Sequence, residues 1–270
     1  MFSNDSSENE INLGWFTDSP TTKSEAMKIY SVIKKGELHP VYCEDFLIST
    51  YVGESYYLGA VLDGCSSGED SHFASALMGK LLKKISKDIS QQERLLFENP
   101  PLSAEEIAIK MLKKMFWELR DARKHLGLTN VEILSTLILM VYDENQKQAF
   151  IIAIGDGMVA IDGKVTEIDQ DNMPDYMAYH LNHSFDQWFQ KQEHIYRVNN
   201  PQEISIATDG VDTFRSHKTD NPDGFSPIDF LLLDNSMENT QNMLTRKANI
   251  LHKKYGYLPA DDVSIIRVKF

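Results

Sequence analysis

The sequence predicts an α+β fold in which two antiparallel β-sheets pack together and helices lie outside them. Three observations lead to this prediction. Short apolar, β-branched runs indicate strands, two consecutive segments have helical periodicity, and strand-like runs then resume. A parallel fold would alternate strands with helices, whereas this order groups them. The 270 residues contain no internal repeat and no long linker, so a disordered lead at 1–10 and a single domain at 11–270 are expected.

The first part of the chain is predicted to form strands and then a helix. Apolar runs indicate strands between positions 11 and 34, at 46–52 and at 56–62. The period then changes, because apolar residues recur every three or four positions from 71 to 89. This spacing is typical of an amphipathic helix with one face on the protein core.

A second helix has both a start and a stop signal. Ser103, followed three residues later by Glu106, has the form of a capping box, in which each side chain satisfies a backbone N–H of the other residue. Apolar residues at helical spacing continue to about His125, and Gly127 is of the type that ends helices. Two consecutive helices are therefore expected between two groups of strands.

The remaining part of the chain returns to strand-like patterns. The apolar segments expected to form strands are 133–142, 148–157, 158–168, 203–208 and 263–270. Of these, 158–168 is predicted to be a hairpin that turns at Asp162-Gly163. A helix is expected over 239–256, and the polar stretch 212–226 is expected to be a surface loop or flap.

The net charge and the lack of long apolar stretches limit the kinds of molecule that this protein is expected to bind. A formal net charge of -13 disfavours nucleic acid and anionic membrane as main partners, because both would be repelled. No apolar stretch approaches the roughly 18 residues of a membrane helix. The first residues lack the basic and apolar regions of a secretory signal, so a cytoplasmic location is expected. Cys43 and Cys65 are too few for a disulfide scaffold and are expected to be reduced thiols.

Acidic residues recur where apolar strands begin or end. They are Asp63, Asp156 and Asp209, each before a glycine, and the pairs Glu44-Asp45 and Asp261-Asp262. Asp-Gly is also a favoured turn dipeptide, and the remaining examples at 162–163 and 223–224 are assigned to turns. An ionised carboxylate at the end of a buried strand is costly unless it is paired or coordinated, and Lys and Arg are scarce nearby. The joint pattern predicts a site for the hard cations Mg²⁺ or Mn²⁺.

The order of these motifs resembles the metal-dependent protein phosphatases of type 2C (the PPM superfamily), and in particular a divergent, bacterial-type subgroup. The resemblance covers about residue 28 to the end of the sequence. The similar segments are CEDF (43–46), VLDGC (61–65), LSTLILMVY (134–142), AIGDG (153–157), QDNMP (170–174), ATDGVDTF (207–214) and ADDVSII (260–266).

The resemblance implies a four-layer αββα sandwich with a binuclear Mg²⁺ or Mn²⁺ centre at one end of its sheets. In that arrangement Asp63 bridges two ions and the Gly64 carbonyl serves one of them. Asp209 and Asp261 bind the other ion, and Asp156 helps to hold a third, weaker ion. The residues expected at or just behind the ligands are Glu44, Asp45, Asp262 and Cys65. Glu44 and Asp45 would hold metal-bound waters there, which makes Asp45 a candidate catalytic residue.

The implied activity is the direct hydrolysis of phosphoserine and phosphothreonine in a phosphorylated protein by a metal-bridging hydroxide. The chain departs from the family pattern at two positions. Pro40 stands where the eukaryotic members carry a phosphate-binding Arg, and Cys65 stands where they carry a His. His39, beside Pro40, is either a replacement phosphate contact or acid, or a histidine that caps a turn. The alternative function is therefore a weak or inactive pseudo-phosphatase that acts as a binding module.

Overall fold

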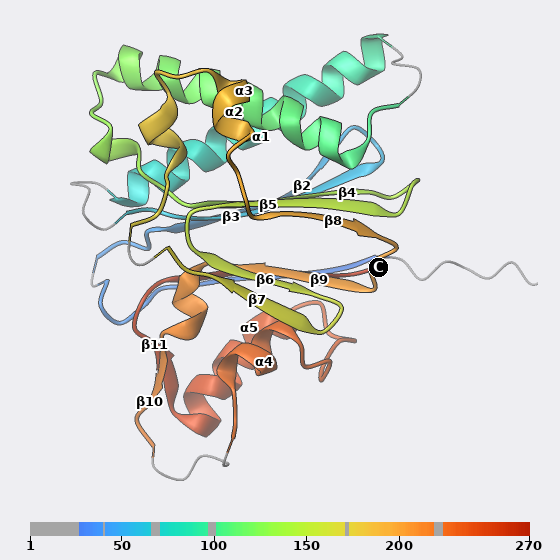
Figure 1. Cartoon of the computed structure of the whole chain (residues 1–270). Coiled ribbons are helices and arrows are strands. Elements are labelled where there is room, and N and C mark those ends of the chain that lie inside the picture. Colours follow the sequence, from blue (N-terminus) through green and yellow to red (C-terminus); the bar gives the residue numbers. More distant parts are fainter. Residues whose placement is uncertain (1–26, 40, 66–70, 97–100, 171–172, 219–223) are drawn as a thin grey trace, which may run out of the picture.

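Two five-stranded antiparallel sheets lie face to face, and helices cover their outer faces (Figure 1). The structure is a computed structural model, and it describes residues 27–39, 41–65, 71–96, 101–170, 173–218 and 224–270. The predicted α+β class and the four layers in the order α, β, β, α are confirmed. No helix in the described part of the chain is long and apolar enough to cross a membrane.

Both sheets combine strands from distant parts of the sequence. The first sheet has the order β1 (Lys28–Lys34), β12 (Val263–Lys269), β9 (Glu203–Ala207), β6 (Gly157–Ile161) and β7 (Lys164–Ile168). The second has the order β2 (Asp45–Val52), β3 (Tyr56–Asp63), β4 (Leu137–Asp143), β5 (Gln148–Ile154) and β8 (Ile195–Asn199). A small two-stranded sheet pairs β10 (Phe214–Ser216) with β11 (Tyr257–Pro259).

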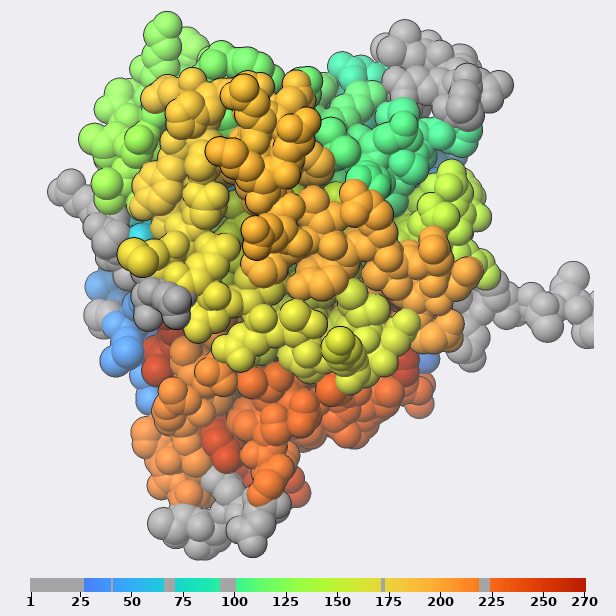
Figure 2. Space-filling view, in the orientation of Figure 1, coloured from blue at the N-terminus to red at the C-terminus, as the bar shows by residue number. Residues whose placement is uncertain are grey.

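The helices form two separate outer layers. The layer over the second sheet contains α1 (Ser71–Leu96), α2 (Ala104–Leu126) and the short α3 (Phe185–Phe189). The layer over the first sheet contains α4 (Pro227–Leu232) and α5 (Met243–Ile250), which continues as a π-helical turn over Leu251–Tyr255. Short 3-10 helices lie at Val131–Ile133, Met177–His180 and Asp209–Asp212. Figure 2 shows the yellow and light-orange segments between β7 and β9 covering one side of the sandwich.

The predicted helix signals are confirmed at α2. The Ser103 side chain accepts a hydrogen bond from the backbone N–H of Glu106, and the Glu106 side chain accepts one from the backbone N–H of Ser103. Gly127 has a φ of 69°, in the left-handed region that glycine adopts at little cost, and it ends the helix. The hairpin at Asp162-Gly163 is also confirmed, since β6 and β7 pair on either side of it.

Other boundaries differ from the prediction. The first helix continues to Leu96, and the helix expected from 239 begins at Met243. The stretch 212–226 is not wholly loop, because β10 lies within it and buries Phe214 against β11. The strand β8 was not predicted. The disordered lead at 1–10, the strands expected before residue 27, positions 171–172 of QDNMP and Asp223 lie outside the described residues.

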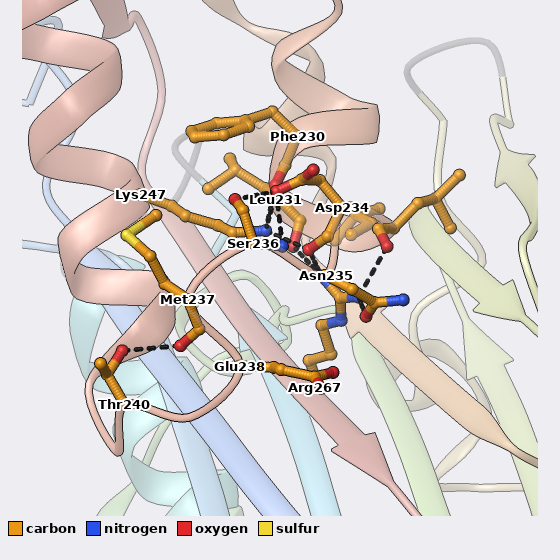
Figure 3. A network of polar contacts seen from close by, with 12 residues as sticks. Phe230, Leu231, Asp234, Asn235, Ser236, Met237, Glu238, Thr240, Lys247 and Arg267 are labelled. Carbon is orange, nitrogen blue, oxygen red and sulfur yellow. Dashed lines mark hydrogen bonds and ion pairs between the residues drawn. The ribbon is translucent and has the colours of Figure 1, made fainter.

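The C-terminal end of α4 is held by two fully buried cations (Figure 3). The Lys247 ammonium donates to the Phe230 carbonyl over 2.8 Å and to the Asp234 carbonyl, and it lies 2.9 Å from an Asp234 carboxylate oxygen. The Arg267 guanidinium, on β12, donates to the carbonyls of Leu231, Leu233 and Asp234 and to the side chains of Asn235 and Glu203. Carbonyls at a helix C-terminus lack partners within the helix, so these cations complete its hydrogen bonding.

Candidate metal centre

Strand alternation directs the acidic side chains into the space between the sheets. In β3, Tyr57 and Val61 belong to the core between the sheets, whereas Leu58 and Leu62 pack under the helices. Because successive side chains point to opposite faces of a strand, Asp63 continues the inward face of Tyr57 and Val61. The apolar run that precedes Asp63 is therefore buried on both faces of the strand. Asp63 follows it as the last residue of β3, so its carboxylate lies at the end of the core between the sheets.

The first two carboxylates face each other across neighbouring strands. Asp45, at the start of β2, is the register partner of Asp63, at the end of β3. Asp45 is only 5% exposed, and its Oδ2 accepts a hydrogen bond of 2.8 Å from the Thr208 hydroxyl of the other sheet. Thr208 Oγ1 in turn accepts a hydrogen bond from the backbone N–H of Ser264. The second carboxylate oxygen of Asp45, Oδ1, is buried and has no hydrogen-bond partner in the described part of the chain.

The carboxylates raise one another's pKa values. Burial raises the pKa of Asp63 well above its usual range, and the charges of Asp45, Asp209 and Asp261 raise it further. Burial is also the largest cause that raises the pKa of Asp45 to about 7. Asp209 is an exposed residue, yet desolvation of its carboxylate and the charges of Asp261 and Asp156 raise its pKa to about 6. The predicted ligands from both sheets therefore lie within electrostatic reach of one another.

Asp262 organises the segment that joins β1 to β2. Its carboxylate is 1% exposed, and Oδ1 accepts a 2.7 Å hydrogen bond from the Gly36 N–H. Oδ2 accepts from the Glu44 N–H and lies 2.8 Å from His39 Nδ1. Both oxygens of Asp262 are thus engaged by this segment, and its place behind the metal ligands stays a prediction. Asp261, next to it, is more exposed, and burial raises its pKa.

His39 is held among three carboxylates. Its Nδ1 lies 2.8 Å from Asp262 and 3.5 Å from Asp261 Oδ1, and its Nε2 lies 3.8 Å from Glu44 Oε2. Burial lowers the pKa of the ring, but the hydrogen bond to Asp262 and the surrounding negative charges outweigh it, so the pKa is raised. The contact with Asp262 explains how the ring is positioned, as expected of a histidine that caps a turn. Its role as a phosphate contact or acid remains a prediction.

Two glycines allow the acidic segments to pack closely. A Cβ on Gly64 would lie 2.0 Å from the Ser71 carbonyl oxygen, and one on Gly210 would lie 1.8 Å from the Asp262 carbonyl oxygen. Both distances are far below van der Waals contact, so any larger residue would displace the backbone. The Gly64 N–H also donates to the Glu44 carbonyl over 3.1 Å. The glycine of each Asp-Gly pair thus fixes the backbone that carries its aspartate.

Asp156 and the two cysteines occupy the surroundings of this cluster. Asp156 is buried, follows β5, and accepts a 2.8 Å hydrogen bond from the Gln170 N–H. Cys65 packs against the core under the helices, and its N–H donates to the Leu134 carbonyl. Burial raises the pKa of Cys43 to about 12, so its thiol stays protonated at neutral pH. Both cysteines are free thiols, as predicted.

The donor set fits a hard divalent cation. Carboxylate oxygens are the ligands that Mg²⁺ and Mn²⁺ prefer, and a cation would relieve the repulsion that raises these pKa values. The unpartnered Asp45 Oδ1 is an available acceptor for such an ion or for a water bound to it. In the described arrangement, however, no three His, Cys, Asp or Glu side chains converge closely enough to hold an ion.

Three hydroxyl-bearing residues of the centre were not predicted. Thr208 and Ser264 link Asp45 to the other sheet, and Thr136 Oγ1 accepts a 3.1 Å hydrogen bond from the Asp63 N–H. Thr136 and Thr208 lie next to strands and continue the inward-facing alternation of their apolar residues. That alternation was the available signal. A separate cavity of about 670 Å³, lined in part by Tyr51 and Tyr142, contains none of the predicted site residues.

Comparison with known proteins supports the family resemblance that the sequence motifs indicate. The family model described as Protein phosphatase 2C matches residues 36–248. No curated protein sequence matches the chain. Among solved structures, the fold is similar to the PP2C phosphatase domain with a regulatory-domain fragment of SpoIIE from Bacillus subtilis, at 16% identity and a TM-score of 0.55. That match covers 90% of this chain and 62% of the SpoIIE chain, so this chain spans less than two thirds of that structure.

Two further structures match along nearly their whole length. The serine/threonine phosphatase Stp1 from Staphylococcus aureus is 15% identical, with a TM-score of 0.57 and coverage of 98% of this chain and 99% of that one. RsbX in complex with magnesium is 15% identical, with a TM-score of 0.51 and coverage of 92% and 96%. Such identities show a shared fold, while the family model covers most of the sequence. The chain belongs to the protein phosphatase 2C family.

Proposed function

We propose that this protein is a Mg²⁺- or Mn²⁺-dependent phosphatase that removes phosphate from phosphoserine and phosphothreonine in a protein substrate. The observation that carries the proposal is that Asp45 and Asp63, which face each other in one sheet, lie within electrostatic reach of Asp209 and Asp261 from the other. Family membership supports phosphatase chemistry, and the magnesium in the RsbX structure supports the choice of metal. The proposal includes a cytoplasmic location and neither nucleic acid nor membrane as partner.

The proposed ligands of two ions are Asp63, the Gly64 carbonyl, Asp209 and Asp261, with Asp156 for a third ion. When bound, the ions would activate water and neutralise the oxygens of the phosphate group. Thr208 holds Asp45 by one oxygen, so the other oxygen can hold and orient a water molecule.

Asp262 and His39 would position the segment between β1 and β2 next to the centre. Asp262 fixes the backbone of Gly36 and Glu44, and it holds the His39 ring through Nδ1. Nε2 is then the ring atom that can contact a phosphate oxygen. No protein nucleophile is needed for this chemistry, in agreement with the high pKa of the Cys43 thiol.

A second candidate is a pseudo-phosphatase that binds a phosphoprotein without turnover. Pro40 and Cys65, at the positions of the family's Arg and His, favour it, as does the open arrangement of the carboxylates. The retention of Asp63, Asp209 and Asp261 argues against it. Carboxylates whose charged form is so disfavoured reduce stability, and without ions to bind there would be little reason to keep them.

Hydrolysis of p-nitrophenyl phosphate and of a phosphoserine peptide with Mn²⁺ tests the proposal. We expect a rate that EDTA abolishes and that Asp209→Ala lowers at least 100-fold, because a proposed ligand is lost. Asp186→Ala is the matched control, since Asp186 lies exposed on α3 and pairs with Lys113 at the surface. If neither substrate shows a Mn²⁺-dependent rate, the enzyme proposal fails and the pseudo-phosphatase remains.

A further inference from the structure

Three large apolar side chains are exposed in the segment between β1 and β2. Leu38, Val41 and Tyr42 are 73%, 69% and 60% exposed. We call these three side chains the apolar rim. Single exposed apolar residues are common on protein surfaces and need no explanation, but three within five positions form a local group. Their sequence neighbours are His39 and Glu44, which lie in the carboxylate centre.

The backbone that carries the apolar rim is firmly anchored. Upstream, the N–H groups of Glu37 and Leu38 donate to the carbonyls of Pro259 and Ala260 over 3.0 and 2.9 Å. Downstream, the Glu44 N–H donates to Asp262. These bonds attach both ends of the segment to the turn that precedes β12. The rim is therefore held beside the candidate metal centre, and the described parts of the blue segment between β1 and β2 lie at the left end of the sandwich in Figure 1.

Two further contacts limit the freedom of the rim. A Cβ on Gly36 would lie 2.3 Å from the Asp261 carbonyl carbon, so the segment packs directly on the β11–β12 turn. The Tyr42 ring stacks on the His72 ring of α1 with a centroid separation of 4.2 Å and an interplanar angle of 19°. A surface ordered before binding loses less conformational entropy when a partner docks. The described residues at both ends of the rim, Leu38 and Tyr42, are thus held by these contacts, as expected of a binding surface.

The charges around the rim limit the kind of partner. Four acidic side chains lie close by, namely Glu37, Glu44, Asp261 and Asp262. The histidines near them are His39, His72, which stacks on Tyr42, and His217, which lies 3.3 Å from Glu37. Acidic residues of a partner would be repelled here, whereas apolar or uncharged residues would not. A partner segment that presents apolar side chains beside one phosphate group matches both the rim and the centre.

We propose that the apolar rim binds apolar residues flanking the phosphorylated serine or threonine of a protein substrate. This inference rests on the proposed function, because it assumes that the phosphate occupies the carboxylate centre. An extended peptide advances roughly 3.3 Å per residue, so the first two or three residues beside the phosphoresidue fall within about 10 Å of it. Small phosphoesters lack these residues and would gain nothing from the rim.

The test compares two phosphoserine peptides that differ only in the residues flanking the phosphoserine. One carries Leu and Phe at the flanking positions and the other carries Ser and Gly. Burial of one or two apolar side chains predicts that kcat/KM for the apolar peptide exceeds that for the polar peptide by roughly tenfold or more. In the double variant Leu38→Ser/Tyr42→Ser we expect this ratio to fall to nearly one. Because the ratio is taken on the same protein, any change at the metal centre cancels.

Tyr51→Ser is the matched control variant. Tyr51 is also an exposed tyrosine, but it lies six residues along β2 from Asp45, or roughly 20 Å away. The control should keep the preference for the apolar peptide. Equal kcat/KM for the two peptides in the wild type, or an unchanged ratio in the double variant, overturns the inference.

Failure of the proposed function gives a different result. If no substrate is hydrolysed with Mn²⁺, binding of the same two peptides is measured by fluorescence anisotropy. Tighter binding of the apolar peptide that is lost in the double variant would support the rim while the phosphatase proposal fails. Equal binding of both peptides would reject the rim as well.

Discussion

At the scale of single residues, the main feature is a set of carboxylates with raised pKa values. Asp45 shows the cause most clearly, since it is buried opposite Asp63 and only its Oδ2 has a hydrogen-bond partner in the described part of the chain. Burial without a neighbouring cation favours the neutral form, and repulsion between the carboxylates adds to that preference. Stability is thereby reduced at neutral pH, and we propose that a bound cation would offset this cost.

This feature predicts how stability depends on pH when EDTA is present. The pKa of Asp45 is about 7 in the folded protein, against about 3.9 in an unfolded chain. Between these values the folded state binds more protons, so the free energy of unfolding falls as pH rises from about 4 to about 7. Asp45→Asn should reduce this slope, as measured by urea unfolding at pH 5, 6 and 7. An unchanged slope would show that Asp45 does not titrate in this window.

At the scale of elements, local sequence signals were sufficient to place the long helices α1 and α2, but the short helices α3 and α4 and the strands β8 and β10 were not predicted. The caps of α2 involve residues three or four positions apart, so the sequence contains all of the relevant contacts. β10 is three residues long, and its partner β11 lies about 40 positions away, so no local pattern distinguishes it from a loop. β8 is an edge strand in which no residue is buried, and its weak alternation explains why it was missed.

The same scale gives a prediction for the buried cations in Figure 3. Arg267→Met should lower the free energy of unfolding by about 3–5 kcal/mol, because Glu203 and the carbonyls at the end of α4 lose their donor. Lys84→Met is the control, since the Lys84 ion pairs with Asp88 and Glu118 are exposed and should contribute less than about 1 kcal/mol. Urea unfolding at pH 7 measures both. A loss as small as that of the control would mean that the network is not stabilising.

At the scale of the whole molecule, the candidate metal centre joins the two sheets. Asp45 and Asp63 belong to one sheet, whereas Thr208, Asp209 and Asp261 lie at strand ends of the other. An ion held by ligands from both sheets would act as a cross-link between them. The proposal of one domain over 11–270 agrees with this arrangement, because the two sheets would then unfold together.

Calorimetry with and without Mn²⁺ tests this whole-molecule proposal. We expect one unfolding transition, and a rise in its midpoint of roughly 5–10 °C at a Mn²⁺ concentration a hundredfold above the dissociation constant. Asp63→Asn should lose this rise, because the proposed bridging carboxylate is gone, while Asp186→Asn should keep it. Two separate transitions would contradict the single domain, and a full Mn²⁺ effect in Asp63→Asn would contradict the role of Asp63.

The fold class, the two caps of α2 and the candidate acidic residues could all be predicted without the structure. These features depend on the alternation of apolar residues and on the order of motifs, and both can be read along the sequence without knowing which residues are in contact. The family assignment followed from the same motif order and was confirmed by the family model.

The contacts between side chains could not be predicted in this way. The hydrogen bonds between Thr208 and Asp45 and between Asp262 and the Gly36–Glu44 segment join residues that lie more than 150 positions apart. The exposure of the apolar rim was also unpredictable, since Leu38 and Tyr42 resemble core residues in the sequence. Such contacts depend on strand register and on how the two sheets stack, and neither is encoded in a local pattern.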